Sequence, residues 1–323
     1  MSATIPIIDF SSFATEKNEI AKQIHKACTE HGFFYIKGHG ISIALQKQLE
    51  NLSQQFFQLP EEEKLKIAMH HAGKAWRGYF PLNGELTSGK PDLKEGIYFG
   101  TELPADDERV QNEIPLHGAN LFPATPAELK DAVLQYIQEV TNVGHLVMKG
   151  ISLSLGLEEN YFFTKYNQDP LILFRIFHYP PQMKTVTQWG VGEHTDYGLL
   201  TILKQDTTGG LQVKSNDGWI EAPPVENTFI CNIGDMLDRM TGGLYRSTPH
   251  RVINTSGKDR YSFPLFFDPG FDTIIERIPT ATINETKSQR WDNASVHDFN
   301  GTYGEYLLNK IGKVFPGLKK DVL

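Results

Sequence analysis

The sequence predicts a mainly β protein with flanking helices, folded as one compact unit. From residue 171 onward, short runs of apolar or alternating residues recur, and each has the length of a strand. Clusters such as Thr208-Gly209-Gly210 and Gly242-Gly243 separate these runs. Many short strands with evenly spaced turns are typical of a β-sandwich or barrel. The predicted strands are Leu171–Tyr179, Leu199–Leu203, Leu211–Val213, Thr228–Ile233, His250–Ile253 and Tyr261–Phe267.

The first half of the chain and its last residues add helices and two further strands. Apolar residues at steps of three and four, as at Ile20, Ile24 and Ala27, predict amphipathic helices. Short apolar runs bounded by glycine or a polar turn predict strands. We therefore expect strands at Ile5–Phe10 and Phe33–Ile36, and helices at Ile20–Glu30, Leu45–Phe57, Pro126–Leu155 and Thr302–Val314.

The composition indicates a large core and disfavours a polyanionic partner. Of the 323 residues, 40% are hydrophobic, which excludes a disordered chain, and the formal net charge of -8 disfavours a nucleic-acid groove or an anionic membrane surface. The two cysteines, Cys28 and Cys231, cannot form a disulfide framework, and the N-terminus lacks the pattern of a signal peptide. We expect a cytoplasmic monomer that binds a small molecule, with no nucleic-acid or membrane partner.

His194 and Asp196 are the first residues that indicate a specific chemistry. On a strand, residues two apart point to the same face, so an imidazole and a carboxylate would converge there. A surface turn is the commoner explanation of an isolated His-x-Asp pair. Here the apolar run Leu199–Leu203 follows closely, and a polar pair beside a buried strand needs a partner, for which a metal ion is one candidate.

His250 supplies a third candidate ligand, from a different predicted strand. Two histidines and one carboxylate form the facial triad of Fe(II) oxygenases, which leaves coordination positions open for other ligands. A zinc hydrolase can use the same ligand types, but it more often places two of them on a helix, as in His-Glu-x-x-His, and that motif is absent. We therefore predict an Fe(II) site at His194, Asp196 and His250.

A cationic anchor is predicted ten residues after His250. Arg260 and Ser262 share one face of an apolar strand, and a guanidinium can grip a carboxylate with two parallel hydrogen bonds while a hydroxyl donates one more. The alternative is a structural salt bridge between Arg260 and a buried acidic residue. Because the triad is present, the anion site is favoured. Tyr179, which shares a strand face with Arg175, can donate to the same anion.

Several sequence segments resemble those of the plant-type 2-oxoglutarate/Fe(II)-dependent dioxygenase superfamily, which includes isopenicillin N synthase. The resemblance extends over nearly the whole chain. The strings are Ala27–Gly40 (ACTEHGFFYIKGHG), Phe56–Lys64 (FFQLPEEEK), His194–Thr201 (HTDYGLLT), Asn232–Asp235 leading to His250-Arg251-Val252, Arg260–Phe263 (RYSF) and Tyr179-Pro180-Pro181.

The resemblance implies a double-stranded β-helix, or jelly-roll, core with Fe(II) at one open end. It implies that 2-oxoglutarate and O2 are co-substrates, and that Arg260, Ser262 and Tyr179 hold the distal carboxylate of 2-oxoglutarate. It also implies an N-terminal region over 1–120, a helical connection over 121–165, the jelly-roll core over 166–280 and a helical C-terminal segment over 281–323.

The implied activity is oxidation of a C–H bond in a small organic metabolite, with release of succinate and CO2. Hydroxylation, desaturation and oxidative cyclisation all stay open. Two alternatives also stay open, namely a 2-oxoglutarate-independent oxidase of the isopenicillin N synthase type and a non-catalytic ligand-binding relative.

Substrate contacts are expected from residues that fall where such enzymes build their cavity walls. Ordinary packing is the alternative explanation for each of them. A neighbouring string, Gly84–Lys90, matches the front of a phosphate-binding loop, but Pro91 replaces the required Ser/Thr, so we interpret it as an ordinary loop. The candidate substrate contacts are Arg77, Tyr79, Tyr98, Arg175 and Phe267.

Overall fold

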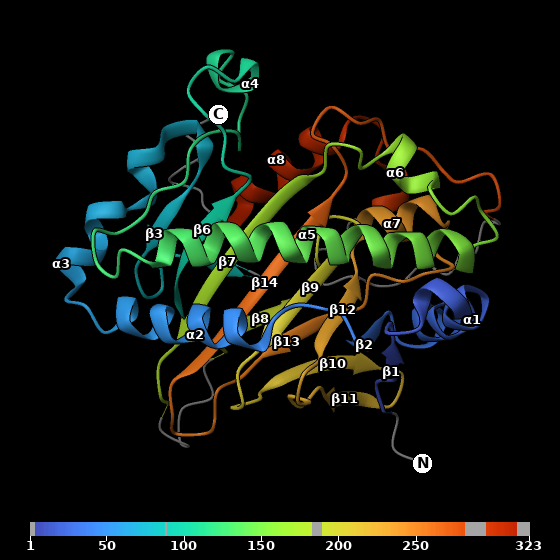
Figure 1. Ribbon diagram of the computed structural model, residues 1–323, viewed down its shortest axis with the longest axis horizontal. Helices are drawn as coiled ribbons and strands as arrows, with labels where there is room; N and C mark the ends of the chain where they lie inside the picture. Colours follow the sequence, from blue (N-terminus) through green and yellow to red (C-terminus); the bar gives the residue numbers. More distant parts are fainter. Residues whose placement is uncertain (1–3, 88, 183–188, 282–294, 315–323) are drawn as a thin grey trace.

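Two main β-sheets and a short two-stranded hairpin, with helices packed around them, make up the part of the chain that the structure describes (Figure 1). The computed structural model describes residues 4–87, 89–182, 189–281 and 295–314. The large sheet has eight strands in the order β1-β2-β12-β9-β14-β7-β6-β3, and the small sheet has four in the order β11-β10-β13-β8. Residues from both sheets line one cavity between them.

Each strand predicted from the sequence begins and ends within about two residues of an observed strand. The observed strands of the two main sheets, predicted or not, are as follows. In the large sheet they are β1 (Ile7–Asp9), β2 (Phe33–Lys37), β3 (Gly78–Phe80), β6 (Glu95–Gly100), β7 (Leu171–Tyr179), β9 (Leu200–Gln205), β12 (Phe229–Ile233) and β14 (Arg260–Asp268). In the small sheet they are β8 (Val191–His194), β10 (Leu211–Ser215), β11 (Gly218–Glu221) and β13 (His250–Val252).

Helices α1, α2 and α5 lie on one side of the large sheet, and α5, the longest helix described, crosses its strands (Figure 1). Helix α5 contacts β9 and β14 as well as helices α1 and α2. The helices are α1 (Phe13–Glu30), α2 (Ile43–Phe57), α3 (Glu61–Lys64), α4 (Glu108–Gln111), α5 (Leu129–Ser154), α6 (Tyr161–Lys165), α7 (Asp235–Met240) and α8 (Tyr303–Val314).

Strand β7 is an almost continuous apolar run because both of its faces are covered. On one face, Phe174 packs with its ring centroid 5.1 Å from that of Tyr136 in α5. On the other face, Arg175, Phe177 and Tyr179 line the cavity. Side chains alternate along the strand, so every second residue points toward the helices and the residues between them point toward the cavity.

Strand β14 is divided between core and cavity in the same way. Arg260, Ser262 and Phe266 line the cavity, whereas Phe267 is fully buried on the opposite face. Its ring lies against α5 at Gly144, where an added Cβ atom would come within 2.4 Å of the ring. Phe267 was expected to contact substrate. That expectation is wrong, because neighbouring residues of a strand point to opposite faces and Phe267 points away from the cavity.

The mainly β class with flanking helices is confirmed, although some elements were not anticipated. Strands β3, β6, β8 and β11 and helix α7 have no counterpart among the predicted runs. The string Gly84–Lys90, predicted as a loop, contributes to a short hairpin of β4 (Leu86–Thr87) and β5 (Lys90–Pro91).

Apart from the β4–β5 hairpin, the described strands of the N-terminal region join the large sheet. Strands β1 and β2 extend the large sheet at the β12 edge, and β3 and β6 extend it beyond β7. The segment boundaries at residues 120, 165 and 280 stay predictions, and most of 281–323 lies outside the described residues. None of the helices in the described ranges is long and apolar enough to cross a membrane.

The opposite faces of β14 allow a paired test of the fold. Replacing Phe267→Ala should lower the free energy of unfolding by about 3–5 kcal/mol, because it leaves a cavity between the sheet and α5. The matched variant Phe266→Ala, which removes a half-buried ring, should cost clearly less. Urea denaturation followed by tryptophan fluorescence measures both. Equal losses would contradict this division of β14.

Candidate active site

One cavity of about 380 Å³ contains the predicted metal ligands and the predicted anchor. Its apolar wall includes Phe33, Leu173, Phe177 and Phe266. Its polar wall includes His194, Asp196, His250, Tyr179, Arg260 and Ser262. Residues far apart in sequence therefore converge on a single enclosed space.

The two histidines meet because strands β8 and β13 pair antiparallel. His194 is the last residue of β8 and His250 is the first of β13, and the two are direct cross-strand partners. Side chains at such positions project to the same face with Cβ atoms about 5 Å apart. The imidazole centroids lie 4.2 Å apart.

Asp196 joins the histidines from a loop, not from their strand. Strand β8 ends at His194, so the expectation that His194 and Asp196 share a strand face is wrong. The loop is instead held by backbone hydrogen bonds from Asp235 to the Asp196 carbonyl (2.8 Å) and from Met236 to the Gly198 carbonyl (3.0 Å).

Close backbone packing requires glycine in this loop. A Cβ atom on Gly198 would lie 1.5 Å from a carboxylate oxygen of Asp268, and one on Gly234 would lie 2.3 Å from the Gly198 carbonyl. Larger residues at either position would push the loop away from α7 and would displace Asp196 with it.

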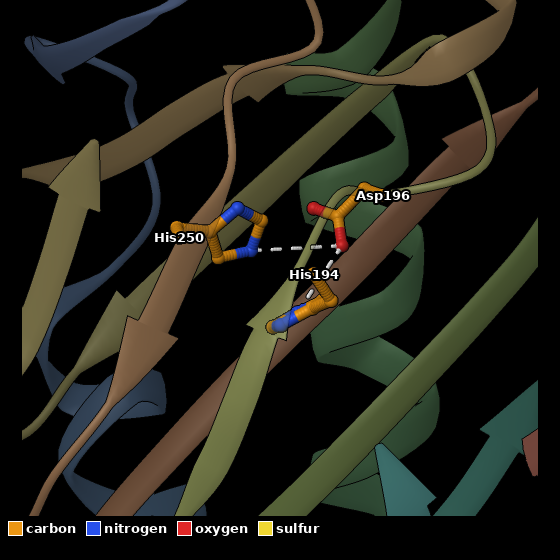
Figure 2. Close-up of side chains that lie close together, drawn as sticks. All are labelled: His194, Asp196 and His250. Atoms are coloured by element: carbon orange, nitrogen blue, oxygen red, sulfur yellow. Dashed lines mark ion pairs between the residues drawn. The ribbon is translucent and has the colours of Figure 1, made fainter. Parts of the chain in front are cut away.

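The hydrogen-bond partners of the three side chains orient their free atoms toward one point (Figure 2). Nδ1 of His194 lies 2.8 Å from the Gly192 carbonyl, and Nδ1 of His250 lies 3.2 Å from the Thr248 carbonyl. Each Nδ1 therefore carries the proton that it donates, and each Nε2 keeps its lone pair.

The carboxylate of Asp196 is oriented in the same manner. Its Oδ2 accepts hydrogen bonds from Thr201 Oγ1 (2.5 Å) and Asn232 Nδ2 (2.6 Å). Its Oδ1 lies 3.8 Å from Nε2 of His194 and 3.7 Å from Nε2 of His250. One ligand atom from each side chain thus lies within 4.8 Å of the others, as expected around a single ion.

The protonation states favour binding of a cation. Burial, followed by the neighbouring imidazole of His250, lowers the pKa of His194 to about 3. Burial by itself raises the pKa of Asp196, but the two histidines and the hydrogen bonds from Asn232 and Thr201 outweigh it and lower that pKa. A neutral imidazole and an ionised carboxylate at neutral pH are the forms that coordinate metal ions.

Arg260 is a buried cation whose ends have no partner among the described residues. Its side chain is 1% exposed, its Nε donates to the Gly209 carbonyl at 2.6 Å, and its Nη1 and Nη2 make no hydrogen bond. No carboxylate of the described ranges forms an ion pair with it, so the structural salt bridge is not found. A buried guanidinium with both ends free needs an anionic ligand.

Tyr179 and Ser262 lie beside that guanidinium. Tyr179 is the cross-strand partner of Arg260, and the guanidinium carbon is 4.6 Å from the tyrosine ring centroid. Ser262 Oγ and the Tyr179 hydroxyl are 3.4 Å apart, close enough for both to contact one ligand oxygen. The three groups form a cluster of donors suited to a carboxylate.

The remaining predicted substrate contacts separate into two sets. Arg175 lines the cavity, but Arg77, Tyr79 and Tyr98 are not among its lining residues. Arg77 donates to the Leu116 carbonyl at 2.8 Å, and Tyr79 donates to Glu95 at 2.5 Å. Tyr98 donates its hydroxyl to Glu85 at 2.8 Å. Because none of these three residues is on the cavity wall, their predicted contact with substrate is corrected to a structural role.

Some cavity residues were missed from the sequence. Asn232 and Thr201, which orient Asp196, could have been found as polar residues in otherwise buried strands, because such residues need partners. Glu85 and Lys94 also line the cavity. Glu85 had no usable signal, because the segment Gly84–Lys90 was interpreted as an ordinary loop.

The residues present fit an Fe(II) ion and a 2-oxo dicarboxylate. Three protein ligands from one side leave open positions, as the facial triad requires. The unpaired ends of Arg260 supply a separate receptor for a carboxylate within the same cavity.

Comparisons with known proteins agree with this chemistry. The model of the 2OG-Fe(II) oxygenase superfamily matches residues 169–269, and a model described as non-haem dioxygenase in morphine synthesis N-terminal matches residues 5–125. The chain is 54% identical to a probable iron/ascorbate oxidoreductase of Dictyostelium discoideum, over 99% of this chain and 97% of that protein.

Two further relatives extend the comparison. A 1-aminocyclopropane-1-carboxylate oxidase of Dictyostelium discoideum is 41% identical, over 97% of this chain and 95% of that protein. The crystal structure of a full-length Neurospora crassa protein in complex with alpha-KG and thymine is similar with a TM-score of 0.80 and 31% identity, over 95% of this chain and 96% of that one.

Both the fold and the family predicted from the sequence are thereby confirmed. The two facing sheets are the double-stranded β-helix core of the family. The chain belongs to the 2OG-Fe(II) oxygenase superfamily and is an oxidoreductase that depends on iron and 2-oxoglutarate.

Proposed function

We propose that His194, Asp196 and His250 hold the Fe(II) ion, and that Arg260, Ser262 and Tyr179 hold the distal carboxylate of 2-oxoglutarate. The assignment of the 2-oxoglutarate site rests on Arg260, whose two terminal guanidinium nitrogens have no hydrogen-bond partner among the described residues. The enzyme oxidises a C–H bond of a small organic metabolite, by hydroxylation, desaturation or oxidative cyclisation. A small-molecule substrate is consistent with the family and with the size of the cavity.

When bound, Fe(II), 2-oxoglutarate and O2 would together supply the oxidising chemistry, with succinate and CO2 as the products of 2-oxoglutarate. The protein supplies position. Arg260 and Ser262 fix one end of the co-substrate, and Asn232 and Thr201 keep the Asp196 carboxylate turned toward the ligand site. The apolar wall, which includes Leu173, excludes water from the reacting groups.

We also propose that the enzyme acts as a monomer in the cytoplasm, without nucleic-acid or membrane partners. Cys28 and Cys231 are both buried and free, which is consistent with a reducing compartment. The net charge of -8 supports the exclusion of polyanionic partners.

The metal assignment predicts loss of both metal and activity in ligand variants. His194→Ala and His250→Ala should each lower the affinity for Mn(II) by more than about tenfold and abolish succinate formation, because each removes one of three ligands. His70→Ala, an exposed histidine, is the control. Titration of Mn(II) followed by electron paramagnetic resonance measures the affinity. Unchanged binding in both variants would rule out the site.

The anchor assignment predicts a specific loss of co-substrate affinity. Arg260→Ala should raise the 2-oxoglutarate concentration for half-maximal binding by about thirtyfold or more, as expected for removal of one partner of a buried charge pair. Ser262→Ala should raise it by about three- to tenfold. Arg109→Ala, which removes a surface ion pair, should leave it unchanged. Calorimetry on the Mn(II)-loaded protein measures the affinity of all three variants for 2-oxoglutarate. An unchanged affinity in Arg260→Ala would contradict the role of Arg260 as the anchor.

A 2-oxoglutarate-independent oxidase is the second candidate, because a relative named as 1-aminocyclopropane-1-carboxylate oxidase is 41% identical. Anaerobic Fe(II) protein should develop a weak visible charge-transfer band when 2-oxoglutarate is added, because the keto acid chelates the metal. Absence of this band, with O2 uptake driven by another substrate alone, would favour the oxidase. A band without succinate formation across a broad substrate panel would favour a non-catalytic relative.

A further inference from the structure

A second group of buried charges lines the cavity apart from the metal ligands and the anchor. Arg175 and Lys94 are its cations, and Glu85 is the acid between them. All three are among the lining residues. Asp92 completes the group by pairing with Lys94 at 2.6 Å. The proposed holding of iron and 2-oxoglutarate uses none of these residues.

Arg175 is rigidly placed but poorly paired. Its guanidinium carbon lies 4.0 Å from the ring centroid of Tyr98 and 4.8 Å from that of Phe266, so the two rings hold it in place. Its Nε has no hydrogen bond among the described residues. Its ion pair with Glu85 is long, at 3.6 Å between Nη1 and Oε1, compared with about 2.8 Å for a good charge-assisted hydrogen bond.

Glu85 is held by two neighbours and keeps capacity for a further donor. Its Oε1 accepts from the Tyr98 hydroxyl at 2.8 Å, and its Oε2 lies 2.9 Å from Lys94 Nζ, which is shared with Asp92. Burial raises the pKa of Glu85, but the charges of Lys94 and Arg175 outweigh it and keep the carboxylate ionised. A carboxylate offers about four acceptor positions, so one remains for a ligand.

The position of Arg175 distinguishes it from the co-substrate anchor. Arg175 and Tyr179 lie four residues apart on the same face of β7, which is about 13 Å at 3.3 Å per residue. The charge of Arg175 also interacts with that of Asp196. Arg175 therefore lies at the other end of this strand face from Tyr179 and the anchor, and its charge is near that of a metal ligand.

We propose that Arg175 and Glu85 bind the prime substrate, and that this substrate is an α-amino acid or a similar small zwitterion. The substrate carboxylate pairs with Arg175, and its protonated amine pairs with Glu85. This inference rests on the proposed function, because it places the substrate beside the iron that His194, Asp196 and His250 hold.

Charge balance favours a zwitterion over other ligands. Within this group of four, the acids Glu85 and Asp92 equal the cations Lys94 and Arg175 in number, so their formal charges sum to zero. A dicarboxylate would bring a second anion against Glu85, and a simple amine would bring a second cation against Arg175. A zwitterion supplies both partners and keeps the buried region neutral. Lys310 and Lys313 of α8 also line the cavity. Lys310 is half-buried and Lys313 is exposed, so water and salt screen these two charges more than those of the buried Lys94 and Glu85.

The first experiment identifies the ligand class. The full chain, loaded with Mn(II) and 2-oxoglutarate under nitrogen, is titrated with the common L-α-amino acids and their basic and cyclic homologues. Each compound that binds is compared with its matched amine, which lacks the carboxylate, and its matched acid, which lacks the amine. We expect at least one amino acid to bind and both of its analogues to bind at least tenfold more weakly. A panel without a binding amino acid, or equal binding of an analogue, would overturn the proposal.

The second experiment assigns the two ends of the substrate. Arg175→Gln should raise the concentration of the binding amino acid for half-maximal succinate formation at least tenfold, and Arg175→Lys should recover part of the loss. Glu85→Gln should reduce the preference for the amino acid over its deaminated analogue, a ratio that a purely structural role would not change. Glu159→Gln, which alters a surface ion pair, is the control. An unchanged ratio in Glu85→Gln would refute the role of Glu85.

The Fe(II)–2-oxoglutarate absorption band separates this inference from the proposed function. If the wild-type protein shows the band and no zwitterion binds, only the substrate class is wrong. If the band itself is missing, the proposed function fails first. The band should persist at the same 2-oxoglutarate concentration in Arg175→Gln, because Arg175 is separate from the anchor.

Discussion

The chemistry of this enzyme depends on the antiparallel pairing of β8 with β13. That pairing makes His194 and His250 direct cross-strand partners, although 55 intervening residues separate them in the chain. A slip of one residue in the register would turn one imidazole to the opposite face of the sheet and would break the site. The contacts between the loop after β8 and α7 then place Asp196 against the same point.

Burial makes the charges in the cavity interdependent. Arg260, Arg175, Lys94, Glu85 and Asp196 all line it, and charges with so little access to water must be matched within the cavity. In the proposed function, the metal ion balances the charge of Asp196, and the distal carboxylate of 2-oxoglutarate balances that of Arg260. The remaining residues already balance one another, which is why a neutral zwitterion suits the end that remains for the substrate.

The division of strands between two environments explains how one sheet serves both stability and catalysis. Along β7 and β14, alternate residues contact α5 and the other helices, while the residues between them line the cavity. The packed face holds the strand in register, so the polar residues on the cavity face are positioned by a rigid framework. Phe267 and Phe266 show the contrast, because neighbours in sequence contribute to opposite sides.

Local patterns in the sequence determined the strand-rich class and the main helices, and they singled out the three proposed metal ligands and the proposed arginine anchor. Each of these depends on residue type and short-range periodicity, which the chain carries by itself, and the metal and anchor residues keep their place in one cavity. Only the tertiary structure decided which face of a strand reaches the cavity, which removed Arg77, Tyr79, Tyr98 and Phe267 from its walls. It also decided that a short hairpin carries Glu85 into the site and that Asp196 approaches from a loop, because register and packing between distant segments leave no local trace in the sequence.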